Sequence, residues 1–465
     1  MTTILDDLLQ AKESRFALRK SFSKKGLINL SLTFNIPGYP KTIPLYEELF
    51  HVIKGQLLKY LLAHRILYLE EQAVSRIDPA GCFYLLPLKN SNKSPGEIKA
   101  LCEKFEQNLS VGRIIDLDIM DTRCEMISSG KAKTCFICPN TPAIKCIRAN
   151  NHTPDVLRKH IDNLIREYLD KYRMNSICRK LSSLAIKSIL SEISLGPKPG
   201  LVDCLHSGAH KDMDYRLFLD STAALSPFFY QIAQQGYTCQ SKLTYEDALP
   251  KFRFIGLYME EEMFKETKNI NTQKGVIFTL GISVFVTAYL LKQNNGFDLK
   301  KFQSYLQKAV KNISKLERPS FKNETHGEYC AKHFPQSGVR WEIEKGLPTV
   351  FNYGLKELRN ILQQKNTISI NKALMNALLG IMANCKDSNI LYRSDLKTFN
   401  QFRKLVKKTK IDFEKHGFDS KELKKLDLFC LRKNISPGGA ADLLIVTYFL
   451  SLVNYHYGNK SNLED

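Results

Sequence analysis

The sequence predicts a multidomain protein in which an N-terminal α/β or α+β domain is followed by an all-α helical domain. The chain has 465 residues, which is too long for one ordinary core and favours two domains. Strand and helix patterns alternate through its first third. From about Val156 onward, apolar residues recur with helical spacing. We place the boundary in a helical connector near residues 170–180, which gives domains of residues 1–175 and 176–465.

The first third supplies the expected mixture of elements. A helix is expected over residues 5–25 because leucines and phenylalanines recur there at roughly helical spacing. A strand is expected at residues 27–36, because Pro37 and Gly38 end that run. The other elements expected here are helices at residues 44–65 and 96–109 and strands at residues 83–87 and 113–120.

The remainder of the chain is expected to be helical. Its longest apolar run, at residues 275–291, contains Gly and Thr and is slightly short for a membrane span. We therefore expect a buried core helix there, with a membrane span as the alternative. The helices expected in this part cover residues 156–195, 217–236, 248–268, 275–292, 298–316, 353–386, 394–416 and 437–457.

Composition indicates which classes of partner the protein binds and in which cellular compartment it resides. The formal charge of +21 favours anionic partners such as polyphosphates, an acidic protein, nucleic acid or an anionic membrane. Many of the charges are late lysines, at residues 404–410 and 421–425, which also suit solvated helix faces. The polar start of the chain shows no secretory signal pattern, so we expect a cytoplasmic protein with reduced thiols. We expect neither membrane insertion nor nucleic-acid binding, because no docking motif occurs.

Two acids in the expected strand at 113–120 carry the first chemical signal. Side chains alternate along a strand, so Asp116 and Asp118 share one face. Such a pair can hold Mg²⁺ against a polyphosphate, as in nucleotidyltransferases, and Arg113 beside it can bind phosphate oxygens. The alternative is a half-exposed strand with solvated acids.

A cysteine-rich segment follows that strand. Cys135 and Cys138 have the spacing C-x2-C, and Cys146 and His152 follow within 14 residues of Cys138. Three thiolates and an imidazole can close a tetrahedral Zn²⁺ site. A cluster of reduced thiols beside a loop is the alternative.

Residues 194–214, SLGPKPGLVDCLHSGAHKDMD, combine rigid turns with titratable groups and show little apolar periodicity. Pro197, Pro199 and Gly200 fix an extended turn. Acid, base and metal-ligand chemistry is then concentrated in a few positions, which is typical of a functional site. Those positions are Asp203, His206, His210, Asp212 and Asp214.

This segment resembles the triphosphoribosyl-dephospho-CoA synthases, whose pattern is roughly TPKPGLVDR-x-N-x-GAH-[RK]-DMD. Further blocks of that family have counterparts at residues 260–280, 326–328, 338–348, 387–393 and 434–444. The N-terminal segments LTFNIPGYPK, GRIIDLDIMD and CFICPNTPAIKCIRANNHT resemble blocks of the apo-citrate lyase phosphoribosyl-dephospho-CoA transferase family.

The resemblance implies a bifunctional enzyme that assembles the citrate lyase prosthetic group. Its C-terminal half would join ATP to 3′-dephospho-CoA and release adenine, which needs a carboxylate base, a metal on the triphosphate and cationic clamps. Its N-terminal half would transfer the product to a serine of the citrate lyase acyl carrier protein and release pyrophosphate. The expected cofactors are Mg²⁺ for the phosphates and, if the cysteine-rich segment binds metal, Zn²⁺.

That chemistry selects candidate residues in both halves. If His210 begins a helix, Asp214 lies one turn away on the same face. Catalytic candidates are Asp116, Asp118, Asp203, His210, Asp214 and Glu342. Substrate-binding candidates are Arg113, Lys198, Lys211, Asn271, Lys274, Arg340, Asn389, Arg393, Ser436, Gly438 and Gly439. Metal candidates are Asp116, Asp118, Asp212, Glu262 and Asp387 for Mg²⁺, and Cys135, Cys138, Cys146 and His152 for Zn²⁺.

Several candidates also have purely structural interpretations. Ser436 suits a helix N-cap with Pro437 at the first helical position. Asp442 suits an acid favoured by the helix dipole. Residues 260–262 suit a solvated face, and His206 and His326 suit hydrogen-bonded structural roles.

The sequence also departs from the synthase pattern. Gln273 stands where the family usually has His, and Trp341 where it has Gly. These departures leave open a diverged fusion with one inactive half. The same chemistry on a malonate decarboxylase carrier protein is a further hypothesis, and a basic nucleic-acid-binding protein is a more remote one.

Overall fold

A computed structural model describes residues 4–89, 92–128, 130, 132–240, 243–294, 296–311, 313, 333–334, 336–363 and 369–458. The chain divides into two compact units, residues 1–173 and 174–465. The long helix α5 (Pro154–Ile193) belongs to both, because the division falls within it. Its Ile161, Ile165 and Leu169 enter the core of the first unit, and residues from Cys178 onward enter the core of the second.

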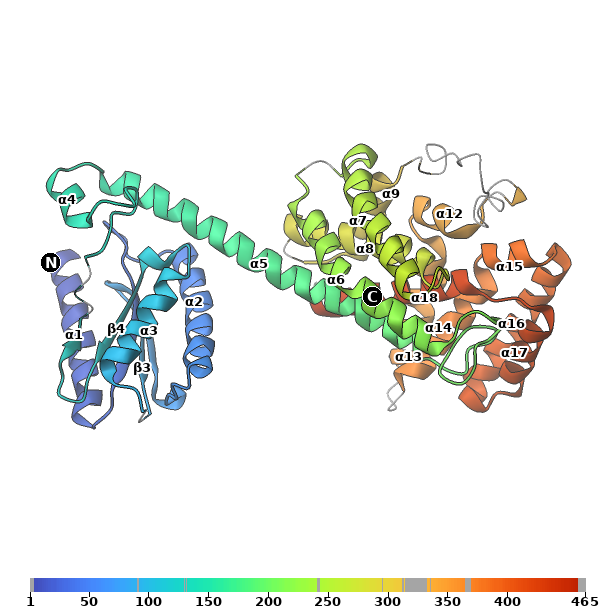
Figure 1. Cartoon of the computed structure of the whole chain (residues 1–465), viewed down its shortest axis with the longest axis horizontal. Helices are drawn as coiled ribbons and strands as arrows, with labels where there is room; N and C mark the ends of the chain where they lie inside the picture. Colours follow the sequence, from blue (N-terminus) through green and yellow to red (C-terminus); the bar gives the residue numbers. More distant parts are fainter. Residues whose placement is uncertain are drawn as a thin grey trace. The chain divides into compact units, whose positions relative to one another are not determined.

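The N-terminal unit is an α+β structure around one five-stranded antiparallel sheet of order β2-β3-β1-β4-β5 (Figure 1). Its strands are β1 (Asn29–Phe34), β2 (Val74–Asp78), β3 (Gly81–Pro87), β4 (Ile115–Met120) and β5 (Met126–Ile127). Its helices are α1 (Ile4–Lys24), α2 (Pro44–Ala63), α3 (Pro95–Gln107), α4 (Ala143–Arg148) and the first part of α5. The expected mixed fold is therefore present.

Helices cover both faces of this sheet. On one face, Phe22 of α1 packs on Phe83 and Leu85 of β3. On the other face, residues such as Leu32 and Leu117 pack on α2, α3 and α5. Alternation along each strand produces this division.

The described residues of the C-terminal unit include no β-strand, so its regular structure there is helical, as expected. Its helices after α5 are α6 (Tyr215–Thr238), α7 (Tyr245–Glu266), α8 (Lys274–Gln293), α9 (Leu299–Ala309), α12 (Gly338–Glu344), α13 (Leu355–Leu362), α14 (Ile370–Asn384), α15 (Ser388–Arg393), α16 (Leu396–His416), α17 (Lys421–Lys433) and α18 (Gly438–Tyr457), shown in Figure 1.

Two of these helices, α8 and α18, are long and apolar enough to cross a membrane by length and composition. The protein itself covers 83% of the apolar window of α8 and 61% of that of α18. Every residue of α8 from Thr279 to Leu291 is buried. The expectation of a core helix at residues 275–292 is confirmed.

Several helix boundaries differ from those expected. One helix was expected over residues 353–386, whereas the structure has a π-helical turn (Val350–Gly354) that continues into α13, and a separate α14. The side chain of Ser369 accepts a hydrogen bond from the Asn371 N–H and so starts α14. Asp395 starts α16 in the same way, which separates it from α15. The elements β2, β5, α4, α12, α15 and α17 were not expected.

Two expectations extend beyond the described residues. The block at residues 326–328, including His326, lies outside them, as does most of the expected helix after Ala309. Helix α9 itself ends at Ala309.

Candidate functional site

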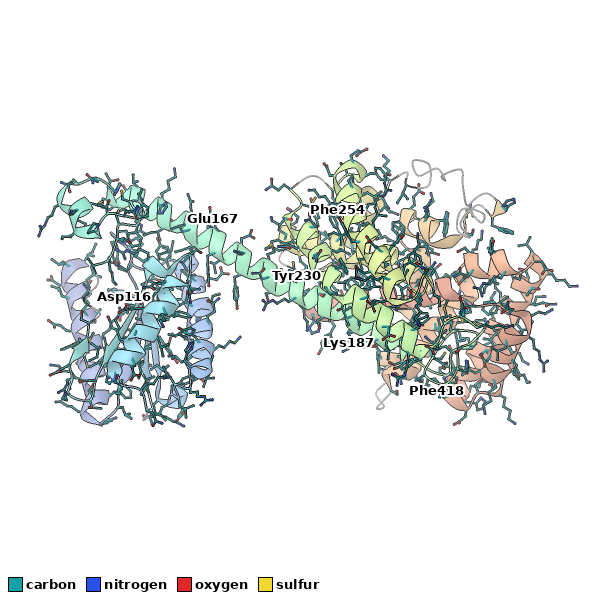
Figure 2. The ribbon with its side chains drawn as sticks, viewed as in Figure 1. Asp116, Glu167, Lys187, Tyr230, Phe254 and Phe418 are labelled. Atoms are coloured by element: carbon teal, nitrogen blue, oxygen red, sulfur yellow. The ribbon has the colours of Figure 1, made fainter. Side chains whose placement is uncertain are left out.

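Asp116, labelled in Figure 2, lies on β4. Asp118 lies two residues later on the same strand, so both side chains are on one face of the sheet. They stand opposite Thr33 and Ser31 of β1, the strand that pairs with β4. Their side chains are 31% and 36% exposed, whereas Leu117 between them is fully buried. Two carboxylates are therefore accessible on one half-exposed strand face.

Cationic side chains meet both carboxylates. Lys133 Nζ lies 2.6 Å from Asp116 Oδ1, and Lys99 Nζ lies 3.5 Å from Asp118 Oδ1. Arg19 of α1 donates a hydrogen bond to the Asp118 backbone carbonyl at 3.1 Å. This arrangement places three cations around a pair of acids, which suits a polyphosphate held through a metal ion.

Helix α3 completes the edge of β4 beside these acids. Lys99 Nζ donates to the Leu117 carbonyl at 2.5 Å, and Glu106 Oε1 accepts from the Leu117 N–H at 2.9 Å. The two side chains therefore replace a missing strand partner. Burial raises the pKa of Glu106 to about 7.

Arg113 occupies the short 3₁₀ turn (Gly112–Ile114) that leads into β4. Its Nε donates to the Thr134 carbonyl at 2.6 Å, and its guanidinium carbon lies 4.2 Å from the centre of the Phe136 ring. Burial lowers the pKa of Arg113, and the nearby Asp116 carboxylate opposes that shift. Arg113 thus links the acid-bearing strand to the cysteine-rich loop.

Cys135, Cys138, Cys146 and His152 come together in space. One ligand atom from each of the four residues lies within 4.8 Å of the others. Cys138 Sγ is 3.2 Å from His152 Nε2. Burial acts to raise the pKa of Cys135, but hydrogen bonds from the N–H groups of Cys138 and Ile137 and from the thiols of Cys146 and Cys138 together outweigh it, so this pKa lies below its ordinary value. A lower pKa favours the thiolate, which is the form that binds metals. Burial and the neighbouring thiols raise the pKa of Cys138.

In the C-terminal unit, Asp203 and Lys198 organise the segment of residues 197–206 from the inside. Asp203 Oδ2 accepts from the Lys198 N–H at 2.6 Å, and its Oδ1 accepts from the N–H groups of Leu205 and His206. Lys198 is 1% exposed, and its Nζ lies 2.5 Å from Glu192 Oε1. Both side chains are therefore already engaged within the protein.

His210, Asp212 and Arg393 lie close together. His210 Nδ1 is 3.7 Å from Asp212 Oδ1. Burial and the positive charge of Arg393 lower the pKa of His210, while Asp212 opposes them. The neutral form of the His210 imidazole is therefore favoured.

The expected pairing of His210 with Asp214 on one helix is wrong. Helix α6 begins at Tyr215, and Asp214 is its N-cap, accepting from the Leu217 N–H at 2.9 Å. The adjacent Lys211 is exposed. The expected cap of α18 is also wrong. The N-cap of α18 is Pro437, whereas Ser436, which was expected to cap this helix, lies one residue earlier and is buried.

Asp387 lies between the starts of two helices. Its Oδ1 accepts from the Asn389 N–H and its Oδ2 from the Ala440 N–H, both at 2.9 Å. Gly438 and Gly439 at the start of α18 therefore face Asn389 and Asp387. Burial raises the pKa of Asp387 to about 6, although these N–H donors oppose the shift.

Two further acids, Asp442 and Glu192, lie near Asp387. Asp442 lies on the first turns of α18, and its Oδ2 sits against Gly275 at the start of α8. Burial raises the pKa of Asp442 well above its ordinary value, and the charges of Asp387 and Glu192 add to the shift. The starts of α8, α15 and α18 thus meet around a carboxyl group whose protonated form is favoured by burial.

The start of α8 holds three of the positions singled out in the sequence. Asn271 Oδ1 accepts from the Lys274 N–H at 3.2 Å, and Lys274 Nζ lies 2.8 Å from Glu260 Oε2. Gln273 is 2% exposed, and its amide bonds with the hydroxyls of Ser221 and Thr222 on α6. Gln273 is therefore buried against α6 and joined to it by hydrogen bonds.

Glu262 lies apart from that arrangement. Its Oε2 is 3.6 Å from Lys265 one turn later on the same helix.

A small cavity lies between α12, α15 and α18. Trp341, Glu342, Asp387 and Gly439 are among the residues that line it. Glu342 is 4% exposed and accepts from the Thr349 hydroxyl and N–H, and burial raises its pKa. Arg340, one residue before Trp341, is exposed. Trp341 and Asp387 thus line the same cavity.

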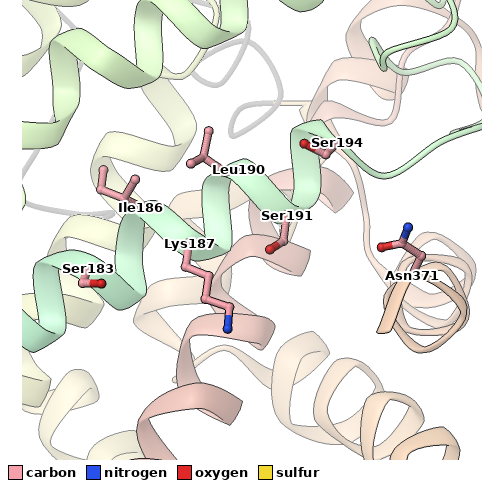
Figure 3. A pocket seen from close by; sticks show the side chains of 7 residues that line it. All are labelled: Ser183, Ile186, Lys187, Leu190, Ser191, Ser194 and Asn371. Atoms are coloured by element: carbon pink, nitrogen blue, oxygen red, sulfur yellow. The ribbon is translucent and has the colours of Figure 1, made fainter. Parts of the chain in front are cut away.

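A second hollow runs along α5 (Figure 3). Its lining comes from one side of α5 between Ser183 and Ser191, from Ser194 just after that helix, and from Asn371 of α14. Apart from Ser194, the first residue of the segment 194–214, it contains none of the positions discussed in the sequence analysis, and none of its lining residues is a candidate site residue.

Comparison with known proteins identifies both units. Residues 3–168 match the family model described as apo-citrate lyase phosphoribosyl-dephospho-CoA transferase, and residues 178–461 match that described as ATP:dephospho-CoA triphosphoribosyl transferase. This chain is a fusion of the two transferase families.

Relatives have the same organisation. Protein CitXG of Leuconostoc mesenteroides subsp. cremoris is 31% identical over 443 residues, covering 90% of each chain. Protein CitXG of Haemophilus influenzae is 26% identical over 96% of this chain and 95% of its own. A probable 2-(5''-triphosphoribosyl)-3'-dephosphocoenzyme-A synthase of Photobacterium profundum is 34% identical over 60% of this chain and 89% of its own. The fusion is thus a transferase for biosynthesis and attachment of the citrate lyase prosthetic group.

Sequence reasoning missed part of the site in this fusion. Glu192 lies in the last turn of α5, two residues before the segment 194–214. No local sequence pattern indicates that it pairs with Lys198. Asp442 was interpreted as a helix-dipole acid, although its neighbours Asp387 and Gly275 are far away in sequence. Both positions depend on tertiary packing.

Proposed function

We propose a division of labour between the two units of the fusion. The C-terminal unit makes 2′-(5″-triphosphoribosyl)-3′-dephospho-CoA and adenine from ATP and 3′-dephospho-CoA. The N-terminal unit transfers the phosphoribosyl-dephospho-CoA group to a serine of the citrate lyase acyl carrier protein and releases pyrophosphate. The two family matches, in this order along one chain, support the assignment. Linkage in one chain raises the local concentration of the shared intermediate.

In the N-terminal unit we assign metal binding to Asp116 and Asp118, in a nucleotidyltransferase-like arrangement. Their shared, half-exposed face suits Mg²⁺, which prefers carboxylate oxygens together with substrate phosphates. Bound Mg²⁺ would neutralise charge on the pyrophosphate leaving group. Lys133 and Arg113 lie beside Asp116 and would bind phosphate oxygens.

In the C-terminal unit we assign proton transfer to His210 and Asp442. When the glycosidic bond of ATP breaks, its electron pair goes to adenine, and Asp442, which lies against Gly275 at the start of α8 and whose protonated form is favoured by burial, would supply a proton to that leaving group. The ribose 2′-hydroxyl of dephospho-CoA forms the new bond to the anomeric carbon, and neutral His210 takes its proton.

The remaining polar groups would hold the triphosphate and its metal ion. We assign phosphate binding to four cationic side chains. These are Lys211 in the loop before α6, Lys274 at the start of α8, Arg340 on α12 and Arg393 at the end of α15. Asp212, beside His210, is the more accessible acid for Mg²⁺, because Asp387 is engaged by backbone N–H groups and Glu262 by Lys265. Lys198, Asp203, Asp214 and Glu342 shape the site through their internal bonds, whereas Asn271, Asn389, Ser436, Gly438 and Gly439 border it.

One assay with purified full-length protein tests the division. With ATP, dephospho-CoA and Mg²⁺, we expect free adenine, and after addition of the acyl carrier protein we expect a carrier whose mass increases by the prosthetic group. Replacing both acids, Asp116→Asn with Asp118→Asn, should abolish the mass change and leave adenine release intact. Replacing the exposed Glu13→Gln on α1 is the matched control and should change neither. Normal carrier modification by the double variant would refute the metal assignment.

The identity of the carrier protein is a separate question. The N-terminal family description names citrate lyase, which favours its carrier over that of malonate decarboxylase. Offering both carriers in equal amounts to the same enzyme would decide between them. We place the reaction in the cytoplasm, because its substrates are ATP and dephospho-CoA.

A further inference from the structure

We propose that Cys135, Cys138, Cys146 and His152 bind one Zn²⁺ ion, and that this ion fixes the loop of residues 133–136 over the acids of β4. The second part of this inference, the positioning of the loop, rests on the proposed transfer reaction of the N-terminal unit. The metal site itself stands on the geometry of the four residues alone.

The donor set fits zinc. Three thiols and an imidazole are the ligands of a common structural zinc site, in which Zn–S distances are about 2.3 Å. Two sulfurs on such a tetrahedron lie roughly 3.8 Å apart. In this protein the four ligand atoms already lie within 4.8 Å of one another. A small closure therefore completes the coordination shell.

The ligands join three separate pieces of chain. Cys135 and Cys138 lie in the loop after β5, Cys146 on α4, and His152 just before α5. The Cys135 N–H donates to the Thr141 carbonyl at 2.8 Å, and the Asn151 N–H to the Cys146 carbonyl at 3.1 Å. These backbone bonds hold each piece locally, whereas a metal ion would tie all three together.

The same loop carries the contacts to the transferase site. Lys133 forms the ion pair with Asp116, the Thr134 carbonyl accepts from Arg113, and the Phe136 ring lies against the Arg113 guanidinium. These three residues surround Cys135. Fixing Cys135 through zinc therefore fixes the position of two cations beside Asp116, which makes the zinc ligands positioning residues for the transfer reaction.

Metal content is the first test. Full-length protein purified without chelator should contain one zinc per chain by plasma mass spectrometry. Cys138→Ser should lose it, and Cys124→Ser, a free cysteine of the same unit outside the cluster, should keep it. His152→Cys replaces one zinc ligand by another and should also keep it. Zinc-free wild type with a disulfide among the three cysteines, or zinc retained in Cys138→Ser, would overturn the site.

Activity then tests positioning. Cys138→Ser should lower carrier modification at least tenfold while leaving adenine release by the other unit unchanged, whereas His152→Cys should retain carrier modification. Lys133→Ala should retain zinc but lose carrier modification, and adding Cys138→Ser to it should cause little further loss. If zinc-free protein modified the carrier at the normal rate, the positioning role would be refuted although the site remained. Failure of the wild type to modify the carrier would instead count against the proposed function, without affecting the zinc result.

Discussion

The carboxylate of Asp387 accepts a hydrogen bond from the backbone N–H of Ala440, 53 residues later in the chain, at 2.9 Å. Through its other oxygen the same carboxylate receives the Asn389 N–H. One buried side chain thus satisfies backbone donors at the starts of α15 and α18, which otherwise have no partner within their helices. The position of Gly438 and Gly439 relative to Asn389 follows from this bond.

Asp387→Asn should therefore destabilise the C-terminal unit. The amide retains one acceptor oxygen and places an NH₂ group against a backbone N–H, and a buried donor left unpaired costs about 1–3 kcal/mol. The only tryptophan, Trp341, lines the same cavity as Asp387, so urea unfolding followed by its fluorescence reports on this unit. The exposed neighbour Lys386→Gln is the control and should unfold like the wild type. Equal stability of both variants would contradict the capping role.

Gly275→Ala should impair adenine release more than stability. A Cβ at Gly275 would overlap Asp442 Oδ2, so the carboxyl must move away from the start of α8. Gly256→Ala on α7 is a matched control, because a Cβ there meets its neighbours at 3.9 Å and beyond. That control should gain up to about 1 kcal/mol through helix propensity and keep its activity. Adenine release at the wild-type rate by Gly275→Ala would argue against Asp442 as the proton donor.

The parts of the fold that sequence predicts best depend on short-range periodicity. The alternation of β4 placed Asp116 and Asp118 on one face, and C-x2-C spacing brought Cys135 and Cys138 together. The break within the helix expected at residues 353–386 was missed because apolar periodicity outweighed the N-cap signal of Ser369. The helix expected at residues 394–416 is present as α16, which begins two residues later than expected.

The C-terminal site was less accessible to sequence reasoning, because its contacts join distant segments. Asp387, Asp442 and Glu192 influence one another although they come from the start of α15, from α18 and from α5. Long-range packing of this kind leaves no periodic pattern. The family motifs indicated Asp387 but could not show that its oxygens are held by backbone N–H groups.

The buried pair of Lys198 and Glu192 predicts strong coupling. Lys198→Met leaves the Glu192 carboxylate buried without its partner, which should cost about 3–5 kcal/mol. The double variant with Glu192→Gln removes both charges and should recover part of that loss. Urea unfolding monitored by Trp341 fluorescence gives the coupling free energy. Additive losses would show that the two side chains stabilise the unit independently.

Glu106 predicts how the stability of the N-terminal unit depends on pH. Burial raises its pKa to about 7 from an ordinary value of 4.5, so between these pH values the folded protein holds a proton that the unfolded chain releases. Stability contributed by Glu106 is thus complete below about pH 4.5 and falls as pH rises through 7. Glu106→Gln is neutral at every pH and should lack this part of the decline. The free energies of unfolding of the two proteins are compared by urea unfolding at pH 5, 6 and 7. Chemical labelling of the Cys102 thiol, which is buried in the folded protein, reports on unfolding. Parallel pH profiles would show that Glu106 titrates alike in the folded and unfolded chain, and that its bond to the Leu117 N–H compensates for burial.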